Sequence, residues 1–165
     1  MRVTSKTKYR KFLPYEGLLT TESETALKQQ AERVYKPCHT LTINEFFGVI
    51  NGDYSVLGDM SNPSVLQVYW LKRFAEYVEI FADACKRTKI EPTPEQKQAA
   101  QGCLEMSPAE GMLVFARSYF GLHSFREAGD ITINEYIMAR KDTYNNALVR
   151  RNLEKIQLRK LNSKK

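Results

Sequence analysis

Residues 63–88 have the sequence PSVLQVYWLKRFAEYVEIFADACKRT and contain the longest regular apolar repeat of the chain. Large apolar side chains recur there at alternating three- and four-residue steps, at Leu71, Phe74, Val78, Phe81 and Cys85. Such steps place side chains on one stripe of a helix, and a long apolar stripe has to pack against neighbouring elements. The pattern therefore predicts a central core helix that begins at Asn62-Pro63.

Five further helix starts surround this stretch, each with a Thr or Ser cap and an acidic residue or Gln three positions later. Two of them also have Pro at the first helical position, which favours a helix start. The five are Thr21 with Glu24, Thr42 with Glu45, Thr93-Pro94 with Gln96, Ser107-Pro108 with Glu110, and Thr132 with Glu135. We expect the last of these helices to continue to about residue 160.

Strand patterns are nearly absent, so the sequence predicts an all-α fold with a single helical-bundle domain of about five to six helices. The segment 108–121 has enough bulk to pack against the central helix, in Met112, Phe115, Ala116, Tyr119 and Phe120. We expect an extended basic N-terminal arm and a projecting basic C-terminal helix to flank this domain.

One phrase occurs twice, as Leu41-Thr42-Ile43-Asn44-Glu45-Phe46 and as Ile131-Thr132-Ile133-Asn134-Glu135-Tyr136. Each copy combines a capping box with an apolar residue before the cap and an aromatic residue behind it, as in a hydrophobic staple. Convergence on a good helix start explains the likeness, because the cap itself requires these residue types. Duplication of a larger unit is the alternative interpretation.

Composition indicates a folded protein of the cytoplasm. The chain has 165 residues, of which 42% are hydrophobic and 27% charged, which is typical of one globular domain. No apolar run is long enough for a membrane span, and no signal peptide is recognisable, so we expect no membrane partner. Three cysteines without CxxC spacing predict reduced thiols rather than disulfides or a zinc site.

The charge is distributed unevenly along the chain, whose net charge is +6. The arm 1–15 carries +5, the C-terminal extension 150–165 carries +6, and the helical body 16–149 therefore carries −5. Basic ends of this kind attract nucleic acid or an acidic protein surface over long range. The residues of the arm that we expect to make such contacts are Arg2, Lys6, Lys8, Arg10 and Lys11.

No catalytic, cofactor or metal motif is recognisable: the chain has no nucleotide-binding glycine loop, GxSxG, HExxH, calcium loop or zinc spacing. Cys38-His39 is a pair of sequence neighbours, which rarely face each other, and His123 lies in a turn. Asp53 and Asp59 supply too few oxygen ligands for a metal ion, and Asp53 is typical of a turn. We expect no enzyme, no cofactor and no small-molecule substrate.

Two segments are candidates for partner binding. Tyr69 and Trp70 lie beside the core stripe, where they either pack at its boundary or anchor an interface. The last helix has a predicted core face in Tyr136, Ile137, Tyr144 and Leu148, but its second half cannot be buried against so small a body. That half enters a partner's groove, pairs with a copy of itself, lies on an anionic surface or remains a solvated tail. Its candidate contact residues are Arg150, Arg151, Leu153, Ile156, Leu158, Arg159 and Leu161.

Two stretches resemble small proteins of tailed bacteriophages and mobile elements of gut Bacteroidetes, including the crAss-like phages. The first is LTINEFF at 41–47 with NGDYSVL at 51–57, Trp70 and Glu76-Tyr77. The second is ITINEY at 131–136 with Asp142-Thr143-Tyr144 and the basic helix that follows. The resemblance implies a virion structural component near the neck or tail, or a helper of its assembly, and it implies no catalytic or binding residue.

We therefore expect a phage structural protein of the head-tail connector, ring or tail region. It would assemble in the host cytoplasm, belong to the virion, and pack against copies of itself and other phage structural proteins. One alternative is a tail assembly chaperone, which would be absent from finished particles. The other is a nucleic-acid-binding accessory protein, whose basic ends would grip phosphates without reading sequence.

Overall fold

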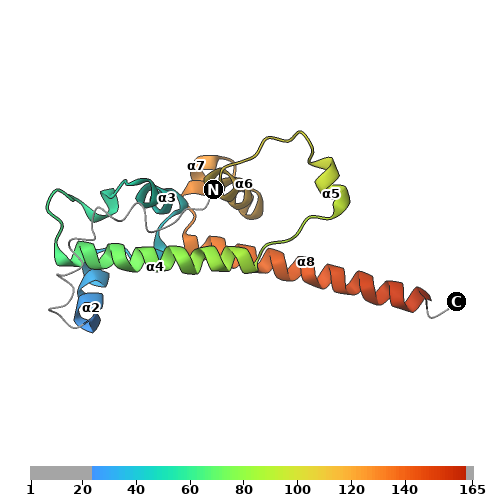
Figure 1. Cartoon of the computed structure of the whole chain (residues 1–165), viewed down its shortest axis with the longest axis horizontal. Coiled ribbons are helices and arrows are strands. Elements are labelled where there is room, and N and C mark those ends of the chain that lie inside the picture. The colour runs from blue at the N-terminus through green and yellow to red at the C-terminus, as the bar shows by residue number, and fades with distance from the viewer. Residues whose placement is uncertain (1–23, 163–165) are drawn as a thin grey trace.

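The computed structural model describes residues 24–162, and within that range it confirms the all-α fold (Figure 1). Seven α-helices are connected by loops and by two short 3₁₀ helices, η2 at Cys38–Thr40 and η3 at Ser55–Leu57. The α-helices are α2 (Glu24–Val34), α3 (Ile43–Asn51), α4 (Val65–Arg87), α5 (Pro94–Ala99), α6 (Pro108–Phe120), α7 (Phe125–Gly129) and α8 (Ile133–Asn162). The basic arm, including Arg2, Lys6, Lys8, Arg10 and Lys11, lies outside the described residues, as does Thr21.

Helix α4 is the central element, as predicted, but it begins later than the Asn62-Pro63 signal. Its cap is Ser64, which accepts a hydrogen bond from the Gln67 backbone, while the Gln67 side chain accepts one from the Ser64 backbone. The buried Gln67 amide also donates to the carbonyl groups of Leu57 and Asp59, at 2.9 Å each. Gln67 thus holds the preceding loop, and the helix begins at the Ser64 capping box rather than at Asn62-Pro63.

The core forms along the predicted stripe of α4. Leu71, Phe74 and Phe81 are at most 8% exposed, and Phe46 of α3 stacks at an angle against both phenylalanines. Helix α6 contributes Met112 and Ala116, and α8 contributes Tyr136, all of them buried. Two aromatic residues of the predicted α6 face are instead partly exposed: Tyr119 is 42% and Phe120 is 36% exposed, and both lie in the last turn of the helix.

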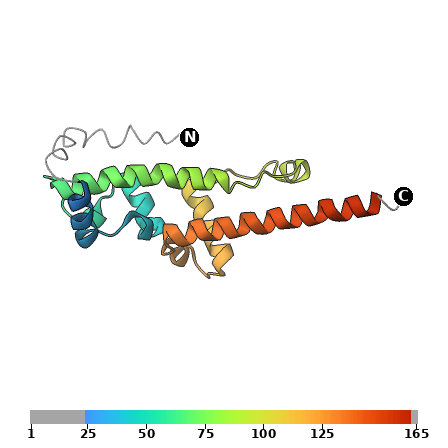
Figure 2. The ribbon, with the colours of Figure 1, turned by 90° about the horizontal axis from the view of Figure 1, so that it is seen from below.

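Helices α4 and α8 run side by side in the same direction, and α8 continues well beyond the end of α4 (Figure 2). Arg140 of α8 fastens the C-terminus of α4. Its guanidinium donates to the Thr88 hydroxyl (3.0 Å), to the Tyr136 hydroxyl (3.1 Å), and to the carbonyl oxygens of Cys85 and Thr88 (3.3 Å each). The last turn of α4 thereby obtains partners for carbonyl groups that a helix end leaves unsatisfied.

The two copies of the repeated phrase lie directly side by side. Thr42 and Thr132 form an isolated antiparallel β-bridge, in which Ile43 N donates to Ile131 O (2.9 Å) and Ile133 N donates to Leu41 O (2.8 Å). Each threonine also caps the helix that follows it, α3 or α8. The phrase therefore joins the starts of two helices that lie far apart in the sequence.

Four of the five remaining helix starts are confirmed at Thr42, Thr93, Ser107 and Thr132, each with its capping hydrogen bond. Helix α7 is not among the predicted elements; Ser124 caps it by accepting from Glu127 N. None of the described helices is long and apolar enough to cross a membrane.

Candidate docking surfaces

The distal half of α8 projects from the body and is exposed on all sides (Figure 1). Every residue from Arg151 to Asn162 is exposed, including Leu153 (52%), Ile156 (47%), Leu158 (60%) and Leu161 (64%). The Arg151 guanidinium donates to the Glu91 carbonyl (2.9 Å), which ties the beginning of this half to the loop before α5. Within residues 24–162, the segment therefore gains little burial from the rest of the chain.

The proximal half of α8 packs on the body through Ile133, Tyr136 and Ala139, which are at most 3% exposed. The predicted core face ends earlier than the sequence pattern suggested. Ile137 packs against the core, but Leu148 is 44% exposed and belongs to the projecting half. The reason is geometric, because the neighbouring helices α4 and α6 have ended before α8 reaches that turn.

The apolar residues of α8 change sides along the helix. With about 3.6 residues per turn, Leu158 and Leu161 continue the face that carries Tyr136, whereas Leu153 and Ile156 lie on the opposite face. Val149 shares that opposite face and is 56% exposed. The projecting half therefore offers two apolar stripes, and one of them includes Val149, which the sequence prediction did not contain.

Some of the basic side chains of the projecting half also lie on one line along the helix. Residues 150–162 carry five basic side chains against one acid, Glu154. Arg151, Lys155 and Arg159 follow one another at four-residue steps, which places them on one ridge of the helix. Arg150 and Lys160 lie beyond this ridge. A ridge of this kind can contact successive negative charges on a partner.

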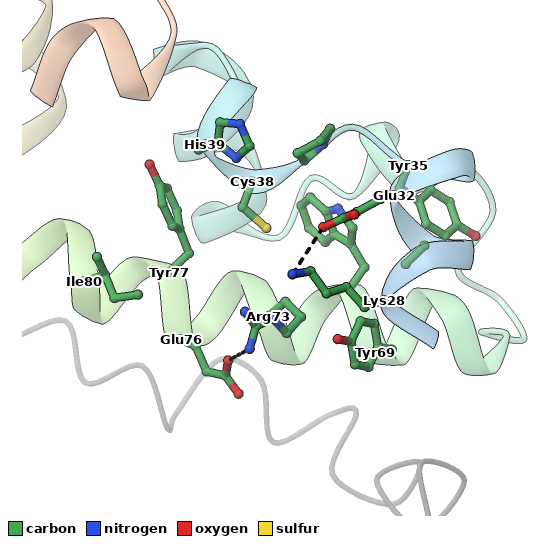
Figure 3. Close-up of a pocket in the computed structure, with 13 residues that line it drawn as sticks. Lys28, Glu32, Tyr35, Cys38, His39, Tyr69, Arg73, Glu76, Tyr77 and Ile80 are labelled. Atoms are coloured by element: carbon green, nitrogen blue, oxygen red, sulfur yellow. Dashed lines mark hydrogen bonds and ion pairs between the residues drawn. The ribbon is translucent and has the colours of Figure 1, made fainter. Parts of the chain in front are cut away.

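The second candidate surface is a cleft between α2, η2 and α4, at the end of the molecule opposite to the α8 tip (Figures 1 and 3). This cleft has a volume of about 160 Å³. Tyr69 and Trp70 line it but are only 4% exposed each, and the Trp70 indole donates to the Lys36 carbonyl (2.8 Å). Both residues are thus core residues that fasten α4 to the α2 end of the body rather than exposed interface anchors.

The charged side chains of the cleft are already paired. Arg73 forms an ion pair with Glu76, and Lys28 lies 4.0 Å from Glu32 (Figure 3). Burial raises the pKa of the Cys38 thiol to about 12, so the thiol stays protonated beside His39 at neutral pH. A nucleophile would need the opposite shift of its pKa. The charged groups of the cleft are therefore engaged with one another, and its thiol is not an activated nucleophile.

The described residues contain no group of three or more His, Cys, Asp or Glu side chains placed to hold a metal ion. Asp53 and Asp59 accept hydrogen bonds from the backbone of Ser55 and Ser61, as expected of turn residues. A calcium loop that ended at Glu135 would need oxygen ligands at Arg126 and Ala128, where the side chains cannot supply them. Glu135 instead caps α8, and hydrogen bonds from Thr132 hold the pKa of its carboxyl below the ordinary value.

No family model matches the chain, and no curated protein and no solved structure is similar to it at a significant level. The projecting half of α8 remains the surface whose exposure, apolar content and charge together favour a macromolecular partner.

Proposed function

We propose that this protein is an assembly protein of tailed bacteriophages, a structural component of the head-tail connector, ring or tail region that acts by docking. The observation that carries this proposal is the projecting half of α8. It presents six large apolar side chains that are 44–64% exposed and that the other described residues leave uncovered. They are Leu148, Val149, Leu153, Ile156, Leu158 and Leu161.

The energetic reason lies in the difference between the free and the docked helix. Burial of apolar surface stabilises by about 25 cal/mol for each Å² removed from water, and this helix can obtain that burial only from another molecule. Its basic side chains would steer the encounter with an acidic surface and orient the docked helix. A long amphipathic helix in a partner's groove is a common mode of protein recognition.

The phage class of the proposal comes from the resemblance of the phrases around Thr42 and Thr132 to small phage proteins. As a virion component the protein would associate with copies of itself and with other phage structural proteins, after assembly in the host cytoplasm. The cleft at α2 and α4 has paired charges and a protonated thiol, which favours a binding role over catalysis.

Deletion of residues 150–165 tests the proposal. We expect the truncated chain to keep its folded helical body and its melting temperature, because the core residues Leu71, Phe74 and Tyr136 remain in place. It should no longer enter particles, as measured by mass spectrometry of purified virions. The matched control is the full-length chain with Asn152→Ala and Gln157→Ala, which leaves the apolar residues unchanged. A truncated chain that still enters particles would overturn the proposal.

The same particles separate a structural component from a tail assembly chaperone, since a chaperone would be absent from the finished virion. A nucleic-acid-binding role is favoured by one observation, the ridge of Arg151, Lys155 and Arg159. Non-specific binding of this kind depends on phosphate contacts and weakens steeply as salt rises. The deletion would then abolish binding to DNA instead of incorporation into particles.

A further inference from the structure

Six positions of α8 form a continuous line on the face that points away from the core. They are Asp142, Asn146, Val149, Leu153, Ile156 and Lys160, and all six are exposed. Successive positions are separated by four, three, four, three and four residues. This is the spacing of the contact positions in a two-helix coiled coil. We name this line the α8 seam.

The charges of the seam are segregated along the helix. Asp142 is its acidic end, Lys160 is its basic end, and the apolar residues Val149, Leu153 and Ile156 lie between them. The Tyr119 hydroxyl and the Asn146 amide both donate to Oδ2 of Asp142, at 2.9 and 3.1 Å, and they hold this carboxylate on the seam. The charge pattern therefore has a direction, which a second helix can match in only one orientation.

We infer that the partner of the seam is the seam of a second copy of this chain, paired in antiparallel orientation. In the register that matches the charges, Asp142 lies opposite Lys160 of the other copy, and Val149 lies opposite Leu153 of the other copy. A parallel pair would place Lys160 on Lys160 and Asp142 on Asp142, so like charges would oppose it. The inference rests on the proposed function, because it names one partner of the same projecting helix.

The body leaves room for this pairing. On the same side of α8, nearer its start, Met138 is 62% exposed, and among the described residues Tyr119 of α6 reaches the edge of this face at Asp142. In an antiparallel pair the two bodies lie at opposite ends of the paired helices. The interface is symmetric, with the same patch contributed by each copy, which is the usual arrangement of a homodimer.

The pair would leave part of each helix available for other subunits. Leu158 and Leu161 lie on the opposite face of α8 from Val149 and Ile156, outside the seam. The polar residue Asn146 lies within the seam, opposite Ile156 of the other copy, where it weakens the pair while fixing its register. The dimer is thus suited to join two bodies and to dock onto a further component.

Cysteine crosslinking tests the orientation. The chain carries Cys103→Ser, which removes the exposed native thiol, and two versions are made, one with Asn146→Cys and one with Ile156→Cys. Under mild oxidation we expect the mixture to form disulfides between the two versions. Either version alone should remain largely uncrosslinked, because identical positions then lie about 15 Å apart along the axis. Crosslinks within each version and none between versions would show a parallel pair and overturn the inference.

Charge reversal tests the partner residues. Asp142→Lys and Lys160→Asp should each weaken self-association about tenfold in sedimentation, and the double variant should restore it. The double variant is the matched control, because it lacks the Tyr119 hydrogen bond to Asp142 just as Asp142→Lys does. A double variant as weak as the single variants, or a monomeric wild-type chain at all concentrations tested, would refute the pairing.

The outcomes also separate this inference from the proposed function. A chain that stays monomeric, but loses incorporation into particles when residues 150–165 are deleted, would overturn the pairing and support the proposed function. A chain that crosslinks as expected, but still enters particles after the deletion, would support the pairing and overturn the proposed function.

Discussion

Arg140 provides the most direct test of how α8 is held on the body. The change Arg140→Met keeps the aliphatic stem and removes the guanidinium, with its four hydrogen bonds to Thr88, Tyr136 and Cys85. It also removes a cation whose Cζ lies 5.8 Å from the Tyr136 ring centroid and 5.9 Å from that of Phe115. The variant should therefore lose the link between the end of α4 and the middle of α8.

The expected loss follows from the environment of these bonds. A hydrogen bond from a charged donor contributes about 1.5–3 kcal/mol, but water can reach this half-buried site and replace part of what is lost. We expect the free energy of unfolding to fall by about 2–3 kcal/mol, and the melting temperature by roughly 5–10 °C. Arg140→Lys should lose about half as much, because an ammonium group cannot reach all four acceptors.

Urea unfolding followed by circular dichroism measures both variants. Lys141→Met is the matched control: its side chain is the next one along the helix, it is exposed, and we expect a change within about 0.5 kcal/mol. If Arg140→Met were as stable as Lys141→Met, the Arg140 contacts would not hold α8 on the body, and the reasoning would fail.

Three further predictions concern other parts of the molecule. A Cβ added at Gly129 would clash with the Asn44 side chain, most closely with its Nδ2 and at 2.6 Å with its Cγ and Oδ1, so Gly129→Ala should cost about 1–2 kcal/mol of stability in urea unfolding. The double variant with Asn44→Ala should recover most of that loss, and an unchanged loss would contradict the contact. Alkylation followed by mass spectrometry should label exposed Cys103 at pH 8 long before Cys38. The fold raises the pKa of the Cys38 thiol from 9.0 to about 12. The contribution of this thiol to the free energy of unfolding is therefore complete below pH 9 and declines as the pH rises from 9 toward 12. A Cys38→Ser variant with the same decline would argue against this cause. Any binding to duplex DNA should be independent of sequence and should weaken steeply with salt, because residues 150–162 offer phosphate contacts without a base-reading element; two unrelated labelled duplexes with clearly different affinities would contradict this.

The helix starts could be predicted from the sequence because each depends on residues close together in the chain. At Thr42, Thr93 and Ser107, the cap and the residue three positions later form the same reciprocal hydrogen bonds that the sequence pattern implies. The start of α4 was placed too early, at Asn62-Pro63, although Ser64 and Gln67 form a capping box of the same kind. Local signals therefore located the helices well, and here two local signals competed.

The exposure of individual side chains could be predicted less well, because it depends on where neighbouring helices end. The apolar spacing around Leu148 is the same whether α8 has a neighbour at that turn or has already passed the end of the body. Tyr69 and Trp70 are instead more buried than their position beside the core stripe suggested. The reason is that α2 and η2 cover a face of α4 that its sequence does not mark as core. The α8 seam could have been found from its four- and three-residue steps, but only the structure shows that its face is uncovered.

The two copies of the repeated phrase, at Thr42 and Thr132, each cap a helix and also bind each other. Its residues are those that a capped helix start requires, which is why convergence explains the likeness between the phrases at Thr42 and Thr132. The structure adds a reason for both copies to have the same form, because Leu41 and Ile131 each offer a carbonyl to the first helical residue of the other copy. This exchange of hydrogen bonds is reciprocal, so each phrase completes the start of the other's helix, and we expect a change in one cap to displace both. The start of α8, and with it the direction in which the projecting half leaves the body, therefore depends on residues some ninety positions earlier in the chain.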